Sequence, residues 1–349
     1  MFRYGSSPAG SWRPGAFMFS FSPRRGACSS PQPFPHRPQR EERKSLATFR
    51  LSSAVPILIL VLLLFPAFSA QVHAGTFTDA LGRKVDLPDS PRRIVSLAPH
   101  LTEILFAIGA GDRVVGATAF CDYPEAARRV PRIGGFSDPS IELVLAARPD
   151  VVIATLVGNR RESVEELIRL GLPVYVSGAE AIGEIPREVR RIGAVAGAVQ
   201  GGETAARRME TALAEIARRT FGRPRVAVYY QLWDQPLMTV SDGSFIHDAI
   251  RLAGGRNVFA GLPVANPRVG LEAVVAARPE VMILSGMGKE GAGLASRWSR
   301  YATIPAVAAG RIHIMNSDLL HRPGPRVIEG VEQLARWIHP EAFSDRPGR

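Results

Sequence analysis

The chain has 349 residues, of which 43 are basic and 32 acidic, so its formal net charge is +11. Nine of the basic residues and only two of the acidic ones lie in residues 1–74, which leaves 34 basic against 30 acidic side chains in the rest. This nearly balanced remainder shows no basic stripe interleaved with aromatic residues, which argues against a nucleic-acid-binding protein. The length is sufficient for two domains of ordinary size.

Residues 1–74 have the composition of a targeting segment. Residues 1–45 are rich in Pro, Ser, Gly and Arg without periodicity, which predicts a disordered stretch. A basic region, the apolar run 55–65 and a small-residue pattern ending at Ala74 follow in that order. This order predicts a signal peptide cleaved after Ala74 and a periplasmic mature protein. An uncleaved membrane anchor is the alternative, but the apolar run is shorter than the ~20 residues that a spanning helix needs.

One pattern in the body of the chain occurs twice. Residues 141–154 read IELVLAARPDVVIA, and residues 271–284 read LEAVVAARPEVMIL. In each copy, apolar residues at helical spacing precede a proline, which moves the residue before it out of the right-handed helical conformation. An apolar, mostly β-branched run then suits a strand that is buried on both faces. The duplication predicts two related α/β lobes, one for each copy.

The N-terminal lobe is predicted over residues 75–180. A strand, a helix and a second strand in succession form a βαβ unit, which favours parallel pairing. Loops at 120–124 and 134–139 are expected at the carboxyl ends of strands, where open α/β sheets bind their ligands. Besides the first repeat, the predicted elements are the strand 93–98, the helix 103–108 ended by Gly109, the strand 114–115, the helix 161–170 and the strand 174–176.

Residues 186–222 are predicted to be helical and to connect the lobes. Pro186 begins a helix that Gly201-Gly202 is expected to interrupt. The continuation over residues 203–219 would extend ~25 Å at 1.5 Å per residue, enough to reach from one lobe to the other. An ordinary peripheral helix is the alternative.

The C-terminal lobe is predicted over residues 223–340, and a tail over 341–349. Its elements follow the same alternation of strands and helices as the first lobe. Besides the second repeat, they are the strand 225–230, the helix 245–252, the strand 312–315 and the helix 326–338.

The sequence contains no nucleophile elbow, phosphate loop, HExxH or CxxC motif. The glycines at 288, 291 and 293 lack the strand and helix context of a dinucleotide fingerprint. The histidines are scattered, whereas a bare metal site needs three or four convergent ligands. These observations favour a protein that closes on a ligand without transforming it. A secreted enzyme that uses Asp122, His321 or Cys121 as acid, base or nucleophile is the rival hypothesis.

Several blocks of sequence together resemble one family, the substrate-binding proteins of ABC importers for cobalamin, haem and ferric siderophores, most closely its cobalamin branch. The resemblance covers residues 92–338 approximately and implies two lobes, each a parallel-rich sheet flanked by helices, joined by a long interlobe helix. It also implies a small hinge motion and a monomer that delivers its ligand to a membrane permease with a cytoplasmic ATPase. The blocks are residues 93–99 with Thr102-Glu103, Asp122-Tyr123-Pro124, residues 134–150, and Ser317-Asp318 with Pro325-Arg326.

The resemblance assigns a role to one glutamate in each repeat. Glu142 and Glu272 match the family's two surface glutamates that dock on arginines of the permease. A local role is also open, because a carboxylate in the first turn of a helix gains ~0.3–1 kcal/mol from the helix dipole. Two equivalent acids on two equivalent lobes would suit a pseudo-symmetric partner.

The resemblance also places the ligand in a cleft between the lobes. Aromatic walls suit a flat macrocycle such as a corrinoid, a metal chelate that acts as ligand and not as a resident cofactor. A ferric siderophore or haem is the alternative, although Gly135-Phe136 cannot supply the iron-ligating tyrosine that haem binders carry there. The cleft aromatics could instead be core residues, His321 could serve as a hydrogen-bonding group, and Arg160, Arg268, Arg322 and Arg326 could contact the ligand or lie in solvent. The predicted cleft residues are Phe120, Tyr123, Phe136, Thr155, Tyr230, Trp233, Asn266, Leu319 and His321.

Overall fold

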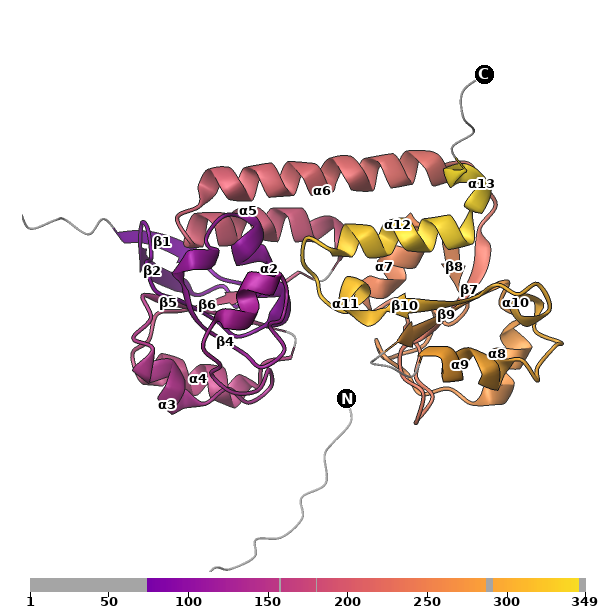
Figure 1. The fold of residues 1–349 in the computed structure, drawn as a ribbon, viewed down its shortest axis with the longest axis horizontal. Coiled ribbons are helices and arrows are strands. Elements are labelled where there is room, and N and C mark those ends of the chain that lie inside the picture. Colours follow the sequence, from indigo (N-terminus) through magenta and orange to yellow (C-terminus); the bar gives the residue numbers. More distant parts are fainter. Residues whose placement is uncertain (1–73, 157, 180, 287–290, 345–349) are drawn as a thin grey trace, which may run out of the picture. The chain divides into compact units, whose positions relative to one another are not determined.

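The computed structural model describes residues 74–156, 158–179, 181–286 and 291–344. This part contains two four-stranded parallel sheets, each with helices on both faces, and a long helix that connects them (Figure 1). The prediction of an α/β protein with two lobes and a long interlobe helix is therefore confirmed. The predicted signal peptide lies outside the described residues, as do residues 345–349 of the predicted tail.

The N-terminal sheet has the strand order β4-β3-β5-β6. Alternate residues of β5 face opposite sides: Val151 and Ile153 pack toward α2 and α5, whereas Val152 and Ala154 pack toward α3 and α4. The strand is thus buried on both faces, as its continuous apolar run predicts. The bounds are β3 Ile94–Ser96, β4 Val114–Ala117, β5 Val151–Thr155, β6 Val174–Ser177, α2 Pro99–Ala107, α3 Ile141–Ala146 and α4 Arg161–Arg169. The hairpin of β1 Ala74–Thr78 and β2 Lys84–Pro88 precedes this sheet.

The C-terminal sheet has the strand order β10-β9-β7-β8. One face packs on α7 and α12, and the other on α8, α9 and α10. The strands are β7 Val226–Gln231, β8 Gly255–Asn257, β9 Val281–Gly286 and β10 Ile312–Asn316. The helices are α7 Phe245–Leu252, α8 Leu271–Ala277, α9 Gly291–Trp298, α10 Pro305–Ala308, α11 Ser317–Leu320, α12 Val327–Ile338 and α13 Pro340–Phe343.

The two sheets share one topology. We number the strands of each sheet in chain order and read the first sheet from β4 and the second from β8. Both sheets then have the strand order second, first, third, fourth. The repeated sequence forms equivalent units, α3 followed by β5 in one lobe and α8 followed by β9 in the other. The duplication inferred from the sequence is therefore present in the fold.

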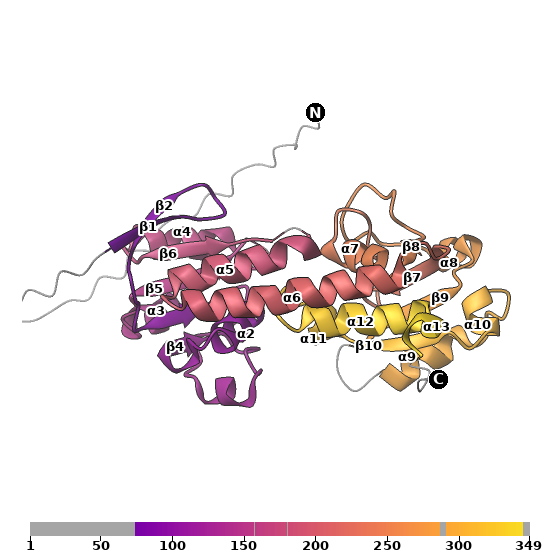
Figure 2. The same ribbon diagram turned by 90° about the horizontal axis from the view of Figure 1, so that it is seen from above.

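The connection consists of α5 Ile185–Val195 and α6 Val199–Thr220, which lie side by side (Figures 1 and 2). The predicted interruption at Gly201-Gly202 is wrong, because both glycines lie in the first turn of α6 and the chain turns at Gly197, with φ 61°. Gly202 instead allows the two helices to approach closely, since a Cβ added there would lie 3.0 Å from the Cα of Gly193. None of the helices in the described part of the chain is both long and apolar enough to cross a membrane.

The helix α2 begins earlier than predicted, at Pro99 instead of residue 103. Proline at the first helical position loses no hydrogen bond, because its missing N–H would have had no partner within the helix. The earlier start places Glu103 in the middle of α2, where its side chain is buried.

Candidate ligand-binding site

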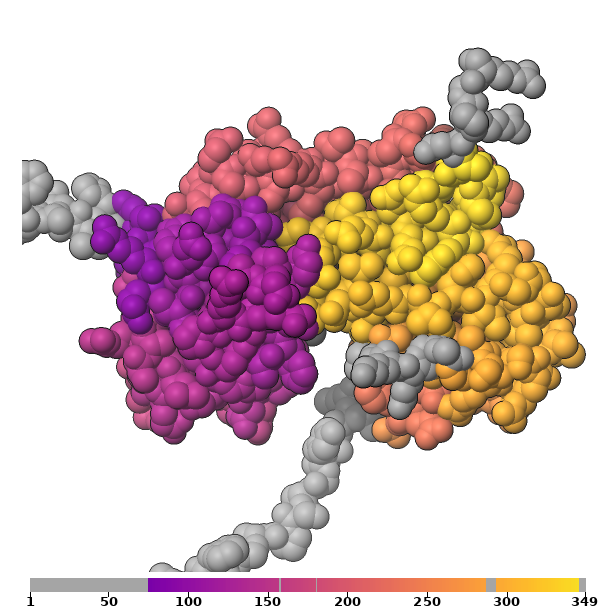
Figure 3. Space-filling view, viewed as in Figure 1, coloured from indigo at the N-terminus to yellow at the C-terminus, as the bar shows by residue number. Residues whose placement is uncertain are grey.

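The predicted cleft residues belong to segments at or beyond the ends of strands in both lobes. Phe120 and Tyr123 follow β4, Thr155 ends β5, and Trp233 follows β7, while Leu319 and His321 lie in and after α11. Since carboxyl ends of parallel strands share one edge of a sheet, each lobe gathers its group at one edge. Figure 3 shows the surface hollowed between the N-terminal lobe (indigo to magenta) and the C-terminal lobe (orange and yellow).

The loop that carries Phe120 is fixed by buried contacts. The side chain of Cys121 is fully buried and its Sγ lies 3.2 Å from Oγ1 of Thr118. The guanidinium of Arg132 donates hydrogen bonds to the carbonyl oxygens of Thr118 and Cys121 at 3.2 and 2.9 Å. Phe120 nevertheless remains 63% exposed. A large aromatic side chain held in solvent by an ordered loop is available to a ligand.

Phe136 is positioned by two residues that the sequence reasoning missed, Gly158 and Asn159. Gly158 has φ 107°, and a Cβ added to it would lie 1.9 Å from Cζ of Phe136, so the ring covers the glycine. Asn159 donates from Nδ2 to the carbonyl oxygens of Leu97 and Phe136, and its Oδ1 accepts from the amide of Thr155. A Gly-Asn pair three residues after the end of a buried strand is a turn signal that could have indicated this role.

On the C-terminal lobe, His321 lies within reach of two hydroxyls. Its Nε2 is 3.0 Å from the hydroxyl of Tyr230 and 3.4 Å from that of Ser285. Burial lowers the pKa of His321 to about 4, so the imidazole is neutral at neutral pH. Tyr230 itself is fully buried in the core, so it reaches the site through His321.

The other predicted residues of this lobe lie on neighbouring loops. Trp233 is 44% exposed, and its Nε1 donates to the carbonyl oxygen of Gln235 at 2.9 Å. Asn266 is exposed on a segment whose flanking carbonyl oxygens accept hydrogen bonds from the amides of Thr239 and Ser241. Leu319 is half-buried against the core. In the N-terminal lobe, Thr155 is buried.

Glu142 and Glu272 are both exposed in the first turns of equivalent helices, α3 and α8. The pKa of Glu142 lies below its usual value because the side chain accepts hydrogen bonds from its own backbone amide and from the hydroxyl of Ser140. The Ser140 hydroxyl donates to Oε2 of Glu142 at 2.8 Å. Glu142 is thus a solvent-facing anion, consistent both with a helix-dipole role and with docking.

Two of the arginines considered as ligand contacts have partners in the other lobe. The side chains of Arg322 and Arg326 are only 12% and 14% exposed, and both pair with Glu103 of α2. No local sequence pattern could indicate this pairing, because the partners are more than 200 residues apart. A hollow of about 350 Å³ opens beside this pairing and is lined by Glu103, Phe106, Ala107, Tyr123, Pro124, Pro325, Arg326 and Glu329.

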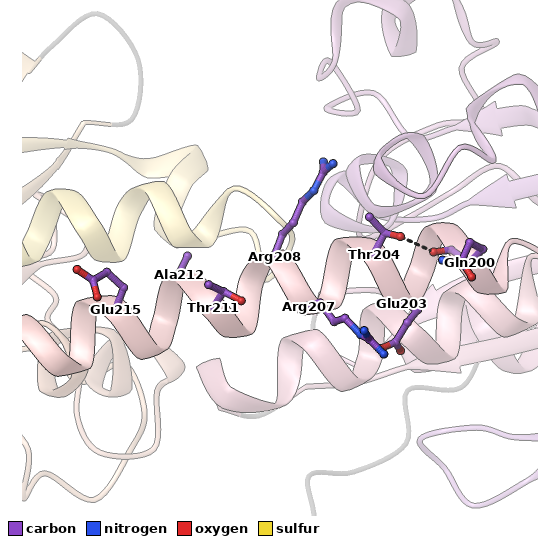
Figure 4. A pocket seen from close by; sticks show the side chains of 8 residues that line it. All are labelled: Gln200, Glu203, Thr204, Arg207, Arg208, Thr211, Ala212 and Glu215. Carbon is purple, nitrogen blue, oxygen red and sulfur yellow. Dashed lines mark hydrogen bonds and ion pairs between the residues drawn. The ribbon is translucent and has the colours of Figure 1, made fainter.

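A larger hollow, of about 690 Å³, lies away from the strand ends. All its lining residues belong to the outer stretch of α6 between Gln200 and Glu215 (Figure 4). It is formed along a single helix, and two of its charged groups, Arg207 and Glu203, pair with each other. Among the described residues, no group of three or more His, Cys, Asp or Glu side chains is arranged to hold a metal ion.

Comparison with known proteins identifies related sequences and folds. A family model described as a periplasmic binding protein matches residues 94–319. The vitamin B12-binding protein of Vibrio vulnificus YJ016 is 32% identical over 251 residues, which are 72% of this chain and 91% of that protein.

Solved structures give the same picture. The periplasmic vitamin B12 binding protein BtuF of Vibrio cholerae matches with a TM-score of 0.67 at 29% identity, over 74% of this chain and 100% of that chain. The periplasmic haem-binding protein RhuT of Roseiflexus sp. RS-1 matches with a TM-score of 0.65 at 26% identity, over 72% of this chain and 99% of that chain.

Proposed function

The chain belongs to the periplasmic binding protein family, and on this premise we propose that it captures a corrinoid, a cobalamin-like ligand, between its two lobes. Proteins of this class bind vitamin B12, haem or siderophores for ABC importers and are not enzymes, so a small-molecule ligand and a permease are its partners. The rival hypothesis of a secreted enzyme is therefore excluded.

The observation that carries the corrinoid proposal is an exposed aromatic side chain at the strand ends of each lobe. Phe120 stands on an ordered loop of the N-terminal lobe and Trp233 on a loop of the C-terminal lobe. Two such side chains offer apolar surface to a large flat ring system with few polar anchors. Vitamin B12-binding relatives at about 30% identity support the same ligand class.

Haem is the second candidate, because a haem-binding protein is among the similar structures. His321 is a neutral imidazole among the predicted cleft residues, yet its Nε2 already faces the hydroxyls of Tyr230 and Ser285. Ligation of an iron through Nε2 would require those contacts to break. The corrinoid proposal requires no such change.

A titration separates these ligands. The mature protein, purified from the periplasm, is titrated with cyanocobalamin, haem and a ferric catecholate siderophore while tryptophan fluorescence is followed. We expect saturable quenching by cyanocobalamin, lost in Trp233→Phe and retained in Trp337→Phe, since Trp337 packs against His313 on the far end of β10. Quenching by haem or the siderophore alone would show that the ligand is not a corrinoid.

We further propose that the leader is removed after Ala74, so that the mature chain begins at Gly75. Mass spectrometry of the periplasmic protein checks the new N-terminus. Retention of residues 55–65 would instead support a membrane-anchored receptor.

The same proposal makes Glu142 and Glu272 the contacts to the permease. They occupy equivalent exposed positions, so a partner with two equivalent subunits could meet one glutamate with each.

A further inference from the structure

A buried glutamate of one lobe holds two arginines of the other. Oε1 of Glu103 accepts hydrogen bonds from Nη1 of Arg322 at 3.0 Å and from Nη2 of Arg326 at 2.6 Å. Oε2 accepts a third from Nε of Arg326 at 2.9 Å. The Glu103 side chain is 2% exposed, so these donors replace the water that would otherwise solvate its charge.

Both arginines also contact the loop that carries Phe120. Nη1 of Arg322 donates to Oδ1 of Asp122 at 3.0 Å. The guanidinium of Arg326 lies 3.8 Å from the ring centroid of Tyr123, a cation–π contact. The two residues that follow Phe120 and Cys121 in the chain are thus held by side chains of the opposite lobe.

The charges within this group are nearly balanced. Nη2 of Arg322 pairs with Asp318 at 2.9 Å, so the two guanidiniums face three carboxylates, those of Glu103, Asp122 and Asp318. Charge-assisted hydrogen bonds of this kind are about twice as strong as neutral ones. Separation of the partners would break these ion pairs. It would leave charged groups that the fold holds away from water without their partners, which is costly.

We propose that Glu103, Arg322 and Arg326 form an interlobe latch, which positions the loop 120–124 for the ligand and limits how far the lobes separate. The helices α5 and α6 join the lobes covalently, and bending along this connection leaves both rotation and opening possible. The latch adds a connection made by charged side chains next to the strand ends. It therefore restricts the motion where a ligand would enter.

This inference rests on the proposed function only in that the lobes are taken to enclose a ligand. Its test uses the ligand-free mature protein. The latch can therefore prove wrong while the ligand assignment is right, and the ligand assignment can prove wrong while the latch is right. Spin labels at Glu162→Cys on α4 and Ala273→Cys on α8, both exposed, report the distance between lobes in a Cys121→Ser background. Amide exchange is measured separately in the protein that keeps Cys121.

The variants are Glu103→Gln and Arg326→Gln, with Glu332→Gln as matched control because it removes an ion pair with Arg336 inside α12 of one lobe. We expect Glu103→Gln and Arg326→Gln to widen the distance distribution at least twofold and to speed exchange of the residue 121 amide, which is bonded to the carbonyl of Thr118, at least fivefold. The control should match the parent protein in both measurements.

Arg322→Gln keeps the Glu103–Arg326 pair and provides the test if loss of Glu103 prevents folding. It should speed exchange of the same amide at least threefold, because Asp122 loses its partner from the other lobe. Parent-like distance distributions in Glu103→Gln and Arg326→Gln, or parent-like exchange in Arg322→Gln, would overturn the latch and leave these residues as ordinary packing.

Discussion

Arg148 and Arg278 occupy equivalent positions in the two lobes and share an uncommon backbone conformation, with φ of 44° and 43°. Each lies between a repeat helix and the proline that precedes its strand. The proline excludes the right-handed helical conformation from the residue before it, and both arginines take the left-handed region instead. The repeat is thus preserved in backbone geometry as well as in residue type.

The left-handed conformation predicts that glycine is better than arginine at both positions. The left-handed conformation costs a non-glycine residue ~1–2 kcal/mol, and glycine avoids this cost. Glycine also loses more conformational freedom on folding, which cancels ~0.5–1 kcal/mol of that gain. We expect Arg148→Gly and Arg278→Gly each to raise the free energy of unfolding by ~0.5–1 kcal/mol in urea titrations. Ala214→Gly, an exposed position inside α6, should lower it by a similar amount, and a loss of stability in all three variants would contradict this expectation.

Gly158 is expected to matter for binding because Phe136 lies over it. Gly158→Ala forces the ring away, since its Cβ would lie 1.9 Å from the ring carbon Cζ. We expect ligand affinity to fall about tenfold, or ~1.4 kcal/mol, by calorimetric titration. Gly171→Ala is the control, because Gly171 also has a positive φ but nothing lies within 4 Å of its added Cβ. Equal ligand affinities of the two variants would show that Phe136 does not contribute to ligand binding.

His321 predicts a specific pH dependence of stability. Its pKa is about 4 in the folded protein, lowered by burial, against about 6.5 when unfolded. Between these values the unfolded chain binds a proton that the folded chain does not, so the free energy of unfolding falls as the pH drops through this window. Well above pH 6.5, His321 is neutral in both states and does not make the free energy of unfolding depend on pH.

The measurement compares denaturant unfolding of the wild type and of His321→Gln from pH 7.5 to 4. The loss of stability on acidification should be smaller in the variant by ~2–3 kcal/mol. The difference between the proteins isolates residue 321 from His100, whose pKa burial lowers to about 3, and from the carboxylates. Identical slopes would show that His321 gains a proton as readily in the folded state.

Docking through the repeat glutamates predicts a loss of transport without a loss of ligand binding. We expect Glu142→Ala with Glu272→Ala to reduce uptake of the ligand by whole cells at least tenfold, and each single change to have a smaller effect. Glu162→Ala, an exposed acid in the first turn of α4, is the matched control. Normal uptake with the double variant would restrict the two glutamates to their local role at helix termini.

The parts of the fold that local sequence determines were predictable. Helical periodicity, β-branched runs and prolines located the repeat units, because each signal lies within about ten residues of the structure that it forms. The break before α6 was misplaced for a physical reason: Gly201 and Gly202 are required by contacts with Ile108 and Gly193, and not by a turn. Glycine alone does not distinguish these two uses.

Only the parts of the site that follow directly from the ends of predicted strands could be predicted from the sequence. The loop with Phe120 was placed correctly after β4, and the strand predicted over residues 225–230 agrees with β7, which ends before Trp233. The partners that organise the Phe120 loop were not predicted, because Glu103 meets Arg322 and Arg326 only through the tertiary fold. Tyr230 could be read either as core or as cleft from its sequence, and it is fully buried because helices cover both faces of β7.

The most direct test of the account is the affinity for cyanocobalamin when the exposed aromatics of both lobes are removed. Calorimetric titration compares the wild type with Phe120→Ala combined with Trp233→Ala, and with Phe221→Ala, a more exposed aromatic that ends α6. We predict that the combined variant binds at least 100-fold more weakly, or ~2.7 kcal/mol, and that Phe221→Ala binds like the wild type. A wild type that does not bind cyanocobalamin, or a combined variant that binds it equally well, would contradict the claim that the lobes hold a corrinoid between these side chains.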